Sequence, residues 1–507
     1  MKNTYAISSA LNLEQFNTIV RNNKNITFTD SVWEKVNKSY DFLKVFANEK
    51  LIYGINTGFG PMAQYKIEQE DQITLQINLI KSHASGLGKA LNNLECKAAF
   101  LARLLIFMQG KSGVHPSLPE LMIQLWNAEA VPVIYEHGGV GASGDLVQLA
   151  HIALGLLGEG KYYVNGEIKE AKEVFKEHNF KPLQIYIREG LALMNGTSCM
   201  TGIAALNVYN AKKLIDWATT SGVWINELMD AYDDHFSLAL NQVKKHKGQM
   251  EVAKKMSEIA VSSKWLKSRK KELYDREVKE KVITEKVQEY YSLRCIPQII
   301  GPVIDTLSYT EKIVEQELNS VSDNPIIDAD AAMIYHGGNF HGDYISLEMD
   351  KLKIAITKVS MLWDRQLNYL LNPNLNKKFP PFLNTGVLGL EFGLQGMQYP
   401  AVSNVAENQM LSNPMYIHSI PNNNDNQDIV SMGSNAALIT KRVIQNTFES
   451  LSIYLLALCK ASQIKGNTEK FSNKIQEAIT FIQAYLPDEK HAFAPFEKMQ
   501  KLVEKLQ

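Results

Sequence analysis

The chain has 507 residues, which is too long for one simple hydrophobic core. Hydrophobic residues make up 45% and charged residues 21% of it, as in an ordinary water-soluble globular protein. The 53 Lys and Arg residues nearly balance the 54 Asp and Glu residues, so the chain lacks the basic excess of a nucleic-acid or anionic-membrane binder. We therefore expect a small-molecule ligand and no nucleic-acid or membrane partner.

The cysteines point to a reducing compartment. Cys96, Cys199, Cys295 and Cys459 are widely spaced and form no paired motif. A disulfide framework or a zinc site is therefore not expected. The first ten residues hold no apolar signal segment, and no apolar run near the C-terminus approaches the roughly 20 residues that span a bilayer. We expect a cytoplasmic protein.

The first half of the chain is expected to mix helices with short extended pieces. Thr29-Asp30 can begin a helix with one apolar face. A glycine-containing loop follows Tyr53, and Tyr162-Tyr163-Val164 before Asn165-Gly166 is typical of a small hairpin. The other expected segments are helices at about 68–86, 93–109, 117–129 and 146–157 and an extended stretch at 131–135.

Long helices are expected after Gly190. The clearest runs from Asp343 to Leu371, with apolar residues at spacings of three and four, and a similar pattern covers about 430–463. The charged stretch Lys244 to Lys286 is expected to be a solvated excursion. The predicted fold is mainly α: a long-helix bundle core over 191–507 and a smaller mixed N-terminal domain over 1–190. The apolar stripe on the clearest helix contains Ile345, Met349, Leu352, Ile356, Val359, Trp363 and Leu367.

A glycine-rich turn stands between a predicted strand and a helix. Gly139 to Gly144 fits the dinucleotide pattern G-x-G-x-x-G. That function also needs a second parallel strand ending in an acidic residue about 20 positions later, where this chain has Gly158-Glu159-Gly160 and a hairpin. A nucleotide cofactor is therefore not expected. The structural alternative is a simple turn in which Asp145 stabilises the N-terminus of the following helix.

The tripeptide Ala142-Ser143-Gly144 can make an electrophile from its own backbone. In a tight bend, the amide nitrogen of Gly144 can attack the carbonyl carbon of Ala142, because a glycine nitrogen is the least hindered. Loss of water closes a five-membered ring, and loss of a second water from Ser143 leaves a conjugated methylidene group. The product is 4-methylidene-imidazole-5-one (MIO), which needs neither a metal nor a nucleotide.

The surrounding run, Gly138 to Leu146, resembles the signature of the histidine, phenylalanine and tyrosine ammonia-lyases. The resemblance covers essentially the whole chain and is strongest to bacterial tyrosine ammonia-lyases. It implies a helical core, a MIO ring at 142–144, and a homotetramer with active sites shared between subunits. The other matching blocks, in the family's order, are Tyr53 to Gly60, Ser82-His83, Leu193 to Thr197, Tyr291 to Arg294, Gly337 to His341 and Asn426 to Asp428.

The resemblance also implies roles for individual residues. Tyr53 matches the base that removes the β-proton. Because a free phenol has a pKa of about 10, the surroundings of this tyrosine must favour ionisation. Asn195 is implied beside the ring, where its amide can polarise the carbonyl, and Tyr291 is implied near the amine and β-carbon. Arg294 matches the residue that binds the substrate carboxylate with a planar, bidentate donor. The further substrate-binding residues that it implies are Gln288, Phe340 and Asn423.

Two places govern the ring pocket in the family. Ser82-His83 matches the histidine lyases, whereas phenylalanine lyases usually carry Phe-Leu and some tyrosine lyases His-Leu. At the second place histidine lyases have Glu, but this chain has Gln427 after Asn426, as in phenylalanine and tyrosine lyases. His83 can bond to a phenolic hydroxyl, and loss of the Glu carboxylate weakens recognition of an imidazole N–H. The combination predicts L-tyrosine as the substrate and trans-4-coumarate and ammonia as products.

Several alternatives stay open. The substrate can be histidine, giving urocanate, or phenylalanine. A tyrosine 2,3-aminomutase uses the same MIO group but returns ammonia to the β-carbon, and no residue separates it from a lyase, because the outcome depends on how fast the cinnamate escapes. A helical scaffold without catalysis would use Tyr53 for packing and Arg294 for a surface ion pair. It gives no reason for Ala142-Ser143-Gly144.

Overall fold

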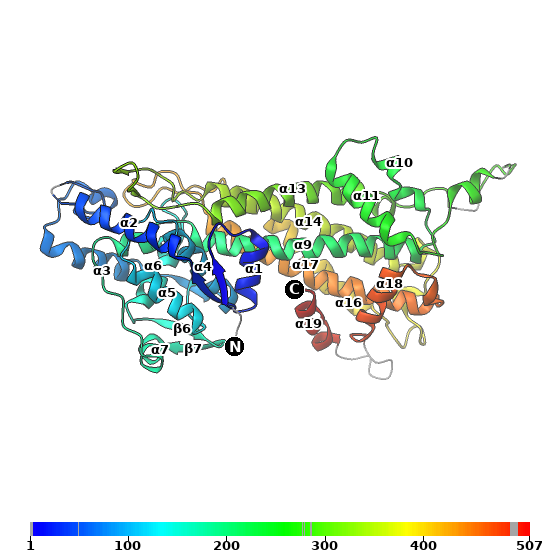
Figure 1. Cartoon of the computed structure of the whole chain (residues 1–507). Helices are drawn as coiled ribbons and strands as arrows, with labels where there is room; N and C mark the ends of the chain where they lie inside the picture. Colours follow the sequence, from blue (N-terminus) through cyan, green and yellow to red (C-terminus); the bar gives the residue numbers. More distant parts are fainter. Residues whose placement is uncertain (1–3, 49, 276, 278, 284–285, 487–494) are drawn as a thin grey trace. The chain divides into compact units, whose positions relative to one another are not determined.

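The computed structural model of the chain describes residues 4–48, 50–275, 277, 279–283, 286–486 and 495–507. Most of these residues lie in α-helices and the strands are short (Figure 1), so the expected mainly α class is confirmed. The chain forms two compact units. The first contains 1–209, 310–350 and 414–441, and the second contains 210–309, 351–413 and 442–507. The boundary expected at residue 190 stays a prediction.

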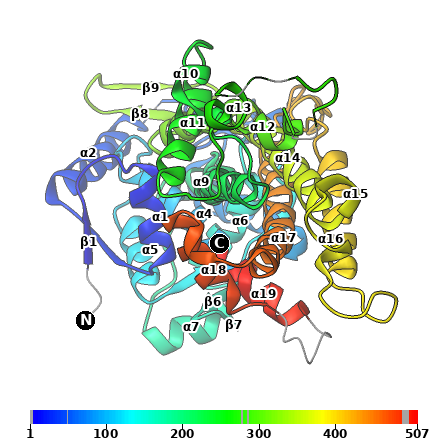
Figure 2. The same ribbon diagram turned by 90° about the vertical axis from the view of Figure 1, so that its right-hand side faces the viewer.

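The first unit carries nearly all of the strands. Of the strands in the described residues, only the β8–β9 hairpin (Figure 2) lies after residue 170. The elements that lie wholly within this unit are β1 (Thr4–Ile7), α1 (Leu13–Arg21), β2 (Asn25–Phe28), α2 (Asp30–Phe46), α3 (Gln72–His83), β3 (Leu87–Ala90), α4 (Asn93–Phe107), α5 (Ser117–Asn127), β4 (Ala130–Pro132), β5 (Tyr135–His137), α6 (Leu146–Leu156), β6 (Lys161–Val164), β7 (Glu167–Glu170), α7 (Ala171–His178), α8 (Glu189–Met194), β8 (Ile326–Asp328) and β9 (Met333–Tyr335).

The remaining helices are longer on average. Four of the five boundaries between the units lie within helices, which are α9 (Ser198–Leu228), α13 (Ile296–Leu318), α14 (Asp343–Leu371) and α17 (Gly433–Lys465). The second unit further holds α10 (Leu238–Asn241), α11 (Lys247–Ala260), α12 (Tyr291–Arg294), α15 (Pro373–Asn376), α16 (Gln395–Leu411), α18 (Asn473–Gln483) and α19 (Pro495–Leu506).

The strand pairing excludes the dinucleotide-binding alternative. β5, which leads into the glycine-rich turn, pairs antiparallel with β3, and β4, β6 and β7 form an antiparallel sheet. Among the described strands only β1 and β2 pair in parallel. The turn is therefore not followed by the parallel strand that a nucleotide fold requires. The predicted hairpin at 162–166 is confirmed, with β6 and β7 as its arms.

Helical periodicity predicted the buried faces well. α2 begins at Asp30, as expected, and buries Val32, Val36 and Leu43. α14 has the predicted bounds, and all seven residues of its apolar stripe are buried. The expectation for 244–286 is wrong in part, because α11 lies within it and buries Val252, Ala253 and Met256. Lysines and glutamates interrupt the sequence between these residues, so the apolar face of the helix is not evident from composition.

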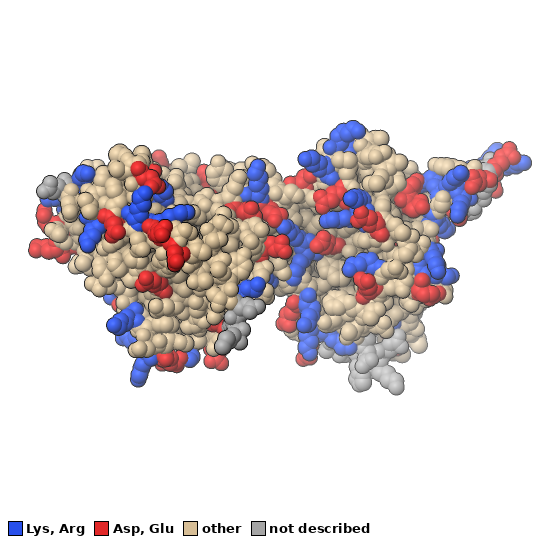
Figure 3. Space-filling view, viewed as in Figure 1, with Lys and Arg blue, Asp and Glu red and all other residues tan. Residues whose placement is uncertain are grey.

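Charges of both signs are interspersed over the face seen in Figure 3, in keeping with the near-zero net charge. None of the helices in the described ranges is both long and apolar enough to cross a membrane. Within the same ranges, no three His, Cys, Asp or Glu side chains are grouped so that they could hold a metal ion.

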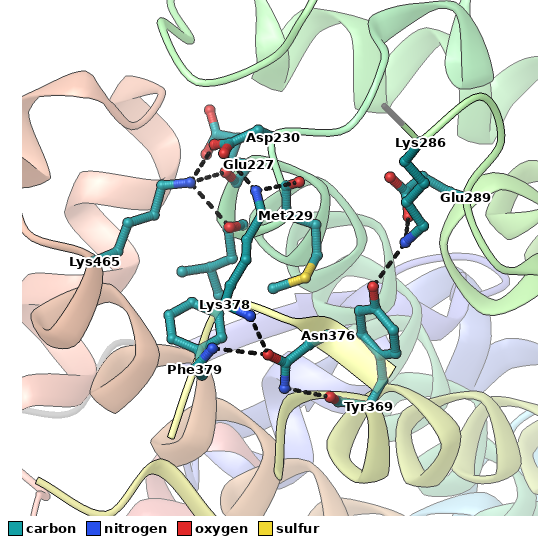
Figure 4. Close-up of polar contacts among 11 residues, drawn as sticks. Glu227, Met229, Asp230, Lys286, Glu289, Tyr369, Asn376, Lys378, Phe379 and Lys465 are labelled. Carbon is teal, nitrogen blue, oxygen red and sulfur yellow. Dashed lines mark hydrogen bonds and ion pairs between the residues drawn. The ribbon is translucent and has the colours of Figure 1, made fainter. Parts of the chain in front are cut away.

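Two lysines close the carboxyl end of α9 in the second unit (Figure 4). Lys465 Nζ donates to the carbonyl oxygens of Glu227 at 3.0 Å and Leu228 at 2.9 Å. Lys378 and Lys465 both pair with Asp230, which follows the helix. The last carbonyl groups of a helix lack intrahelical partners and carry partial negative charge, so the two cations stabilise this end.

A small apolar cluster in the first unit supports the loop that contains Tyr53. Ile52 and Ile55, on either side of this tyrosine, are buried in it together with Leu43 of α2 and with β8 and β9. The loop backbone is therefore anchored by hydrophobic burial, while the exposed Val45 on the same helix takes no part.

We predict that Leu43→Ala lowers the free energy of unfolding by about 2–5 kcal/mol, because it opens a cavity in this cluster. Leu43 is 0% exposed and Val45, on the same helix, is 72% exposed. Val45→Ala should therefore change the free energy by no more than about 0.5 kcal/mol. Urea denaturation of both variants measures the difference. Equal effects would contradict the assigned core.

Candidate active site

The turn Ala142-Ser143-Gly144 joins β5 to α6 and packs against a second turn, Asn195-Gly196, that joins α8 to α9. Gly144 forms a parallel bridge with Gly196, and the amide of the next residue, Asp145, donates to the Gly196 carbonyl at 2.8 Å. Gly144 has a φ of +74°, and a Cβ there would lie 2.0 Å from the Gly196 oxygen. Only glycine fits, which is the residue that ring closure needs on chemical grounds.

Two amide side chains contact the two oxygens of Ser143. Asn195 Nδ2 donates to the Ser143 carbonyl oxygen at 3.3 Å, and Gln427 Nε2 donates to the Ser143 Oγ at 2.9 Å. In a MIO ring the carbonyl of the central residue becomes the ring carbonyl, and its hydroxyl oxygen departs as water. The donors thus face both oxygens whose electrons must be polarised, so these residues fit the group.

Asp145 does not act as the sequence indicated. Its side chain makes no capping bond to α6, which follows it. Instead, Oδ2 accepts from the amides of Cys199 at 2.8 Å and Met200 at 2.9 Å, at the start of α9, and Oδ1 accepts from the hydroxyl of Ser434. The carboxylate therefore stabilises the N-terminus of a helix distant in sequence. Burial raises the pKa of Asp145 to about 6 in spite of these donors.

The Tyr53 loop faces the segment that contains Asn423. The Gly60 amide donates to the phenolic oxygen of Tyr53 at 3.2 Å. A Cβ on Gly60 would lie 2.9 Å from Asn423 Nδ2 and 3.7 Å from Asn426 Oδ1, so the two loops are in close contact. An N–H aimed at the phenolic oxygen stabilises negative charge on it. Gln427, in the same second segment, reaches Ser143 as described above.

Gln76 on α3, which no sequence motif marks, connects this loop to α8. Its Nε2 donates to the Gly54 carbonyl at 2.8 Å, and its Oε1 accepts from the Leu191 amide at 2.8 Å. The side chain is fully buried. Because α8 ends at Asn195, this amide ties the loop of Tyr53 to the helix that leads to Asn195. A single polar residue in a helical pattern carries no signal of such a role.

Ser82 and His83 lie at the C-terminal end of α3, which packs against α6 and α8. His83 Nδ1 lies 3.0 Å from the Leu79 carbonyl oxygen and 3.0 Å from Ser82 Oγ. A carbonyl oxygen only accepts, so this contact is a hydrogen bond in the tautomer that carries the proton on Nδ1, and in that tautomer Nε2 is an acceptor. Phe340 lies in the first unit, in a turn before α14, and is half-buried.

Gln288, Tyr291 and Arg294 come together in the second unit. Arg294 Nη1 donates to Gln288 Oε1 at 2.6 Å and to the Glu289 carbonyl at 2.9 Å, and its guanidinium lies 4.5 Å from the Tyr291 ring centre. Tyr291 is 70% exposed. The segment is held by an ion pair between Lys286 and Glu289, and Lys286 also donates to a tyrosine of α14 (Figure 4). The three residues are thus preorganised on one short stretch of chain.

The sequence of residues 11–484 matches the family model of the aromatic amino acid lyases. The chain belongs to this family. A tyrosine 2,3-aminomutase of Chondromyces crocatus is 39% identical, with 84% of this chain and 81% of the relative covered. A tyrosine ammonia-lyase of Cupriavidus metallidurans is 36% identical, with 91% and 90% covered. Histidine ammonia-lyases are also among the relatives of this aromatic amino acid lyase.

Solved structures agree with this membership. The tyrosine aminomutase from Streptomyces globisporus superimposes with a TM-score of 0.94 at 31% identity, covering 99% of this chain and 97% of that one. The helical fold implied by the sequence resemblance is therefore confirmed. Identity to the tyrosine aminomutase exceeds identity to the tyrosine ammonia-lyase by three points (39% against 36%), too little to choose between a lyase and an aminomutase.

The buried Asp145 of this aromatic amino acid lyase predicts a pH-dependent stability. Its pKa is raised on folding, so protonation favours the folded state. That contribution is complete below about pH 4 and is lost as the pH rises through about 6. Asp145→Asn removes the titration. The free energy of unfolding of the variant minus that of the wild type should therefore rise between about pH 4 and about pH 7, as measured by urea denaturation. A difference that stays constant with pH would refute this.

Proposed function

We propose that the chain is an ammonia-lyase that converts L-tyrosine into trans-4-coumarate and ammonia. The observation that carries the proposal is the pair of amide donors on Ser143, from Asn195 and Gln427, at a turn where only glycine fits after the serine. Membership of the aromatic amino acid lyase family supports the reaction class. The substrate and the residue roles are our inference.

The MIO group, once formed from 142–144, supplies an electrophilic carbon that takes up the substrate amine and makes it a better leaving group. The chain's own residues position and polarise. Asn195 donates to the carbonyl oxygen of Ser143 and so withdraws electron density from the ring that this residue would form. Gln427 donates to the hydroxyl oxygen of Ser143, which assists its departure as water.

Tyr53 acts as the base that removes the β-proton. The Gly60 amide donates to its phenolic oxygen, so a fixed backbone dipole compensates the charge that the oxygen carries when ionised. The apolar cluster around Ile52 and Ile55 and the link through Gln76 hold the loop in place. Precise placement of a base matters because proton transfer requires hydrogen-bond distance.

Arg294 binds the substrate carboxylate through its planar guanidinium. In the chain without substrate, Gln288 and the Glu289 carbonyl accept from one of its terminal nitrogens. A carboxylate can take the remaining donors, while Gln288 keeps the group oriented. Tyr291, whose ring lies against the same guanidinium and is largely exposed, is then available to the amine and β-carbon.

The preference for tyrosine rests on His83. With Nδ1 bonded to the Leu79 carbonyl, Nε2 accepts a hydrogen bond from the phenolic hydroxyl of tyrosine. Phenylalanine would leave this nitrogen without a partner, which weakens binding and slows the reaction. Histidine could also donate to Nε2, but Gln427 offers no carboxylate to accept from the second N–H of its ring.

A tyrosine 2,3-aminomutase is the second candidate. It is favoured by the 39% identity to one such relative and by the TM-score of 0.94 to a solved tyrosine aminomutase. Both candidates use the same base, ring and carboxylate-binding arginine. They differ in whether the product leaves before ammonia returns to the β-carbon.

Product analysis separates these candidates. Purified protein incubated with L-tyrosine should release trans-4-coumarate and ammonia, and its intact mass should be lower than the sequence mass by two water molecules. Ser143→Ala should fold, show the full sequence mass and lose turnover to background. β-Tyrosine as the main product would favour the aminomutase, and urocanate from L-histidine without coumarate from L-tyrosine would overturn the tyrosine assignment.

We predict that His83→Phe raises the ratio of kcat/KM for phenylalanine to kcat/KM for tyrosine by about 10-fold or more, because the acceptor for the phenol is lost. Lys81→Ala is the matched control at the same helix end. Lys81 forms a surface ion pair with Glu159 at 2.7 Å and should not affect the preference. Kinetics with both substrates measure the shift, and an unchanged ratio in His83→Phe would remove this residue from substrate recognition.

A further inference from the structure

A fully buried ion pair lies behind the Asn195-Gly196 turn. Arg103 of α4 and Asp323, in the loop after α13, are both 0% exposed, and Nη2 lies 3.0 Å from Oδ1. The same Nη2 donates to the backbone carbonyl of Asn195 at 2.9 Å. A Cβ on Gly196 would lie 2.4 Å from Arg103 Nη1, so the guanidinium rests directly against the turn. Neither charged residue belongs to the catalytic set described above.

The last turn of α13 and the loop after it fasten the turn at a second point. The Thr197 amide donates to Ser322 Oγ at 3.2 Å, and the Thr197 hydroxyl donates to Glu317 at 2.5 Å. The turn is therefore held on one side by Arg103 and this loop. On its other side, Asn195 and Gly196 contact Ser143 and Asp145.

Asn195 depends on this backbone anchor for its orientation. Its side chain is 4% exposed, and its Oδ1 has no hydrogen-bond partner in the part of the chain that the structure describes. The contact from Nδ2 to the Ser143 oxygen is long, at 3.3 Å. With no second side-chain bond, the direction of the amide is set by the backbone of Asn195, whose carbonyl Arg103 holds.

We propose that Arg103 and Asp323 are positioning residues that aim the Asn195 amide at the carbonyl of the catalytic ring. This inference rests on the proposed function, because it acts through Asn195. The carboxylate of Asp323 orients the guanidinium, and the guanidinium holds the Asn195 carbonyl. The negative charge of Asp323 also compensates the positive charge of Arg103, since an unpaired charge is strongly disfavoured at a site with no solvent exposure.

The test replaces the pair as a unit. Removing one partner leaves a buried unpaired charge and destabilises the fold, whereas replacing both with apolar residues is often neutral. Arg103→Met/Asp323→Leu should therefore fold, yet release the Asn195 carbonyl. We expect kcat, divided by the fraction of chains that show the two-water mass loss, to fall by about 100-fold, with KM changed by less than about 3-fold. An unchanged normalised kcat would overturn the proposal.

Lys111→Met/Asp328→Leu is the matched control. This pair, at 2.9 Å, joins Lys111 to β8, and neither residue is among the hydrogen-bond partners of Asn195 in the described residues. It should leave the normalised kcat within about 2-fold of the wild type. An equal loss in both double variants would show a general disturbance and overturn the proposal.

If Arg103→Met/Asp323→Leu does not fold, the single variant Arg103→Lys decides, because a lysine cannot hold the Asn195 carbonyl and the Asp323 carboxylate in the same geometry. If Arg103→Lys then had the same normalised kcat as the wild type, the proposal that this pair positions Asn195 would be overturned.

A double-mutant cycle tests whether the pair acts through Asn195. In an Asn195→Ala background, replacing Arg103 and Asp323 should cost little further kcat, because the amide that they aim is gone. Additive losses would overturn the proposal. Failure of the proposed function is distinguishable, since it would appear in the wild type as a missing two-water mass loss, and it would remove this inference as well.

Discussion

The close approach of two backbone turns, Ala142-Ser143-Gly144 and Asn195-Gly196, is the constraint on which the site depends. The Gly196 carbonyl oxygen lies only 2.0 Å from where a Cβ of residue 144 would be, and it accepts from the Asp145 amide. This contact brings Asn195 to Ser143 and gives the second turn a fixed distance from the first. Around it, Asn195 and Gln427 donate to Ser143, and the first amides of α9 donate to Asp145.

Buried polar groups act together with apolar packing to hold this region. Asp145 bonds to the start of α9, Gln76 joins the Tyr53 loop to α8, and Arg103 joins α4 to the turn. Such groups are costly unless satisfied, and each of these makes at least two hydrogen bonds. Apolar side chains tolerate small shifts, whereas hydrogen bonds to fixed backbone groups set direction as well as distance. A site that must aim one amide at one oxygen benefits from the second kind of contact.

This arrangement gives Gln427 two possible roles, one toward the substrate ring and one toward Ser143. By family resemblance it belongs to the ring pocket, yet its Nε2 bonds to the hydroxyl oxygen of Ser143. A carboxylate at this position would accept from that hydroxyl instead of donating to it. Under the proposed function, the residue that helps to discriminate among substrates is thus also placed to influence ring formation, which links the two properties through one side chain.

Local patterns in the sequence were sufficient to predict several elements, and they carry the proposal that residues 142–144 form an electrophile. Helix period marked the buried stripe of α14 and the start of α2, turn residues marked the β6–β7 hairpin, and the chemistry of Ala142-Ser143-Gly144 follows from three adjacent residues. Only the tertiary structure decided what Asp145, Gln76 and Arg103 do, and that α11 is packed. Their partners, such as Cys199, Leu191 and Asp323, lie from about fifty to over two hundred residues away. Periodicity reports which face of a helix is buried, but the partner of a buried polar group is set by long-range packing that no local pattern encodes.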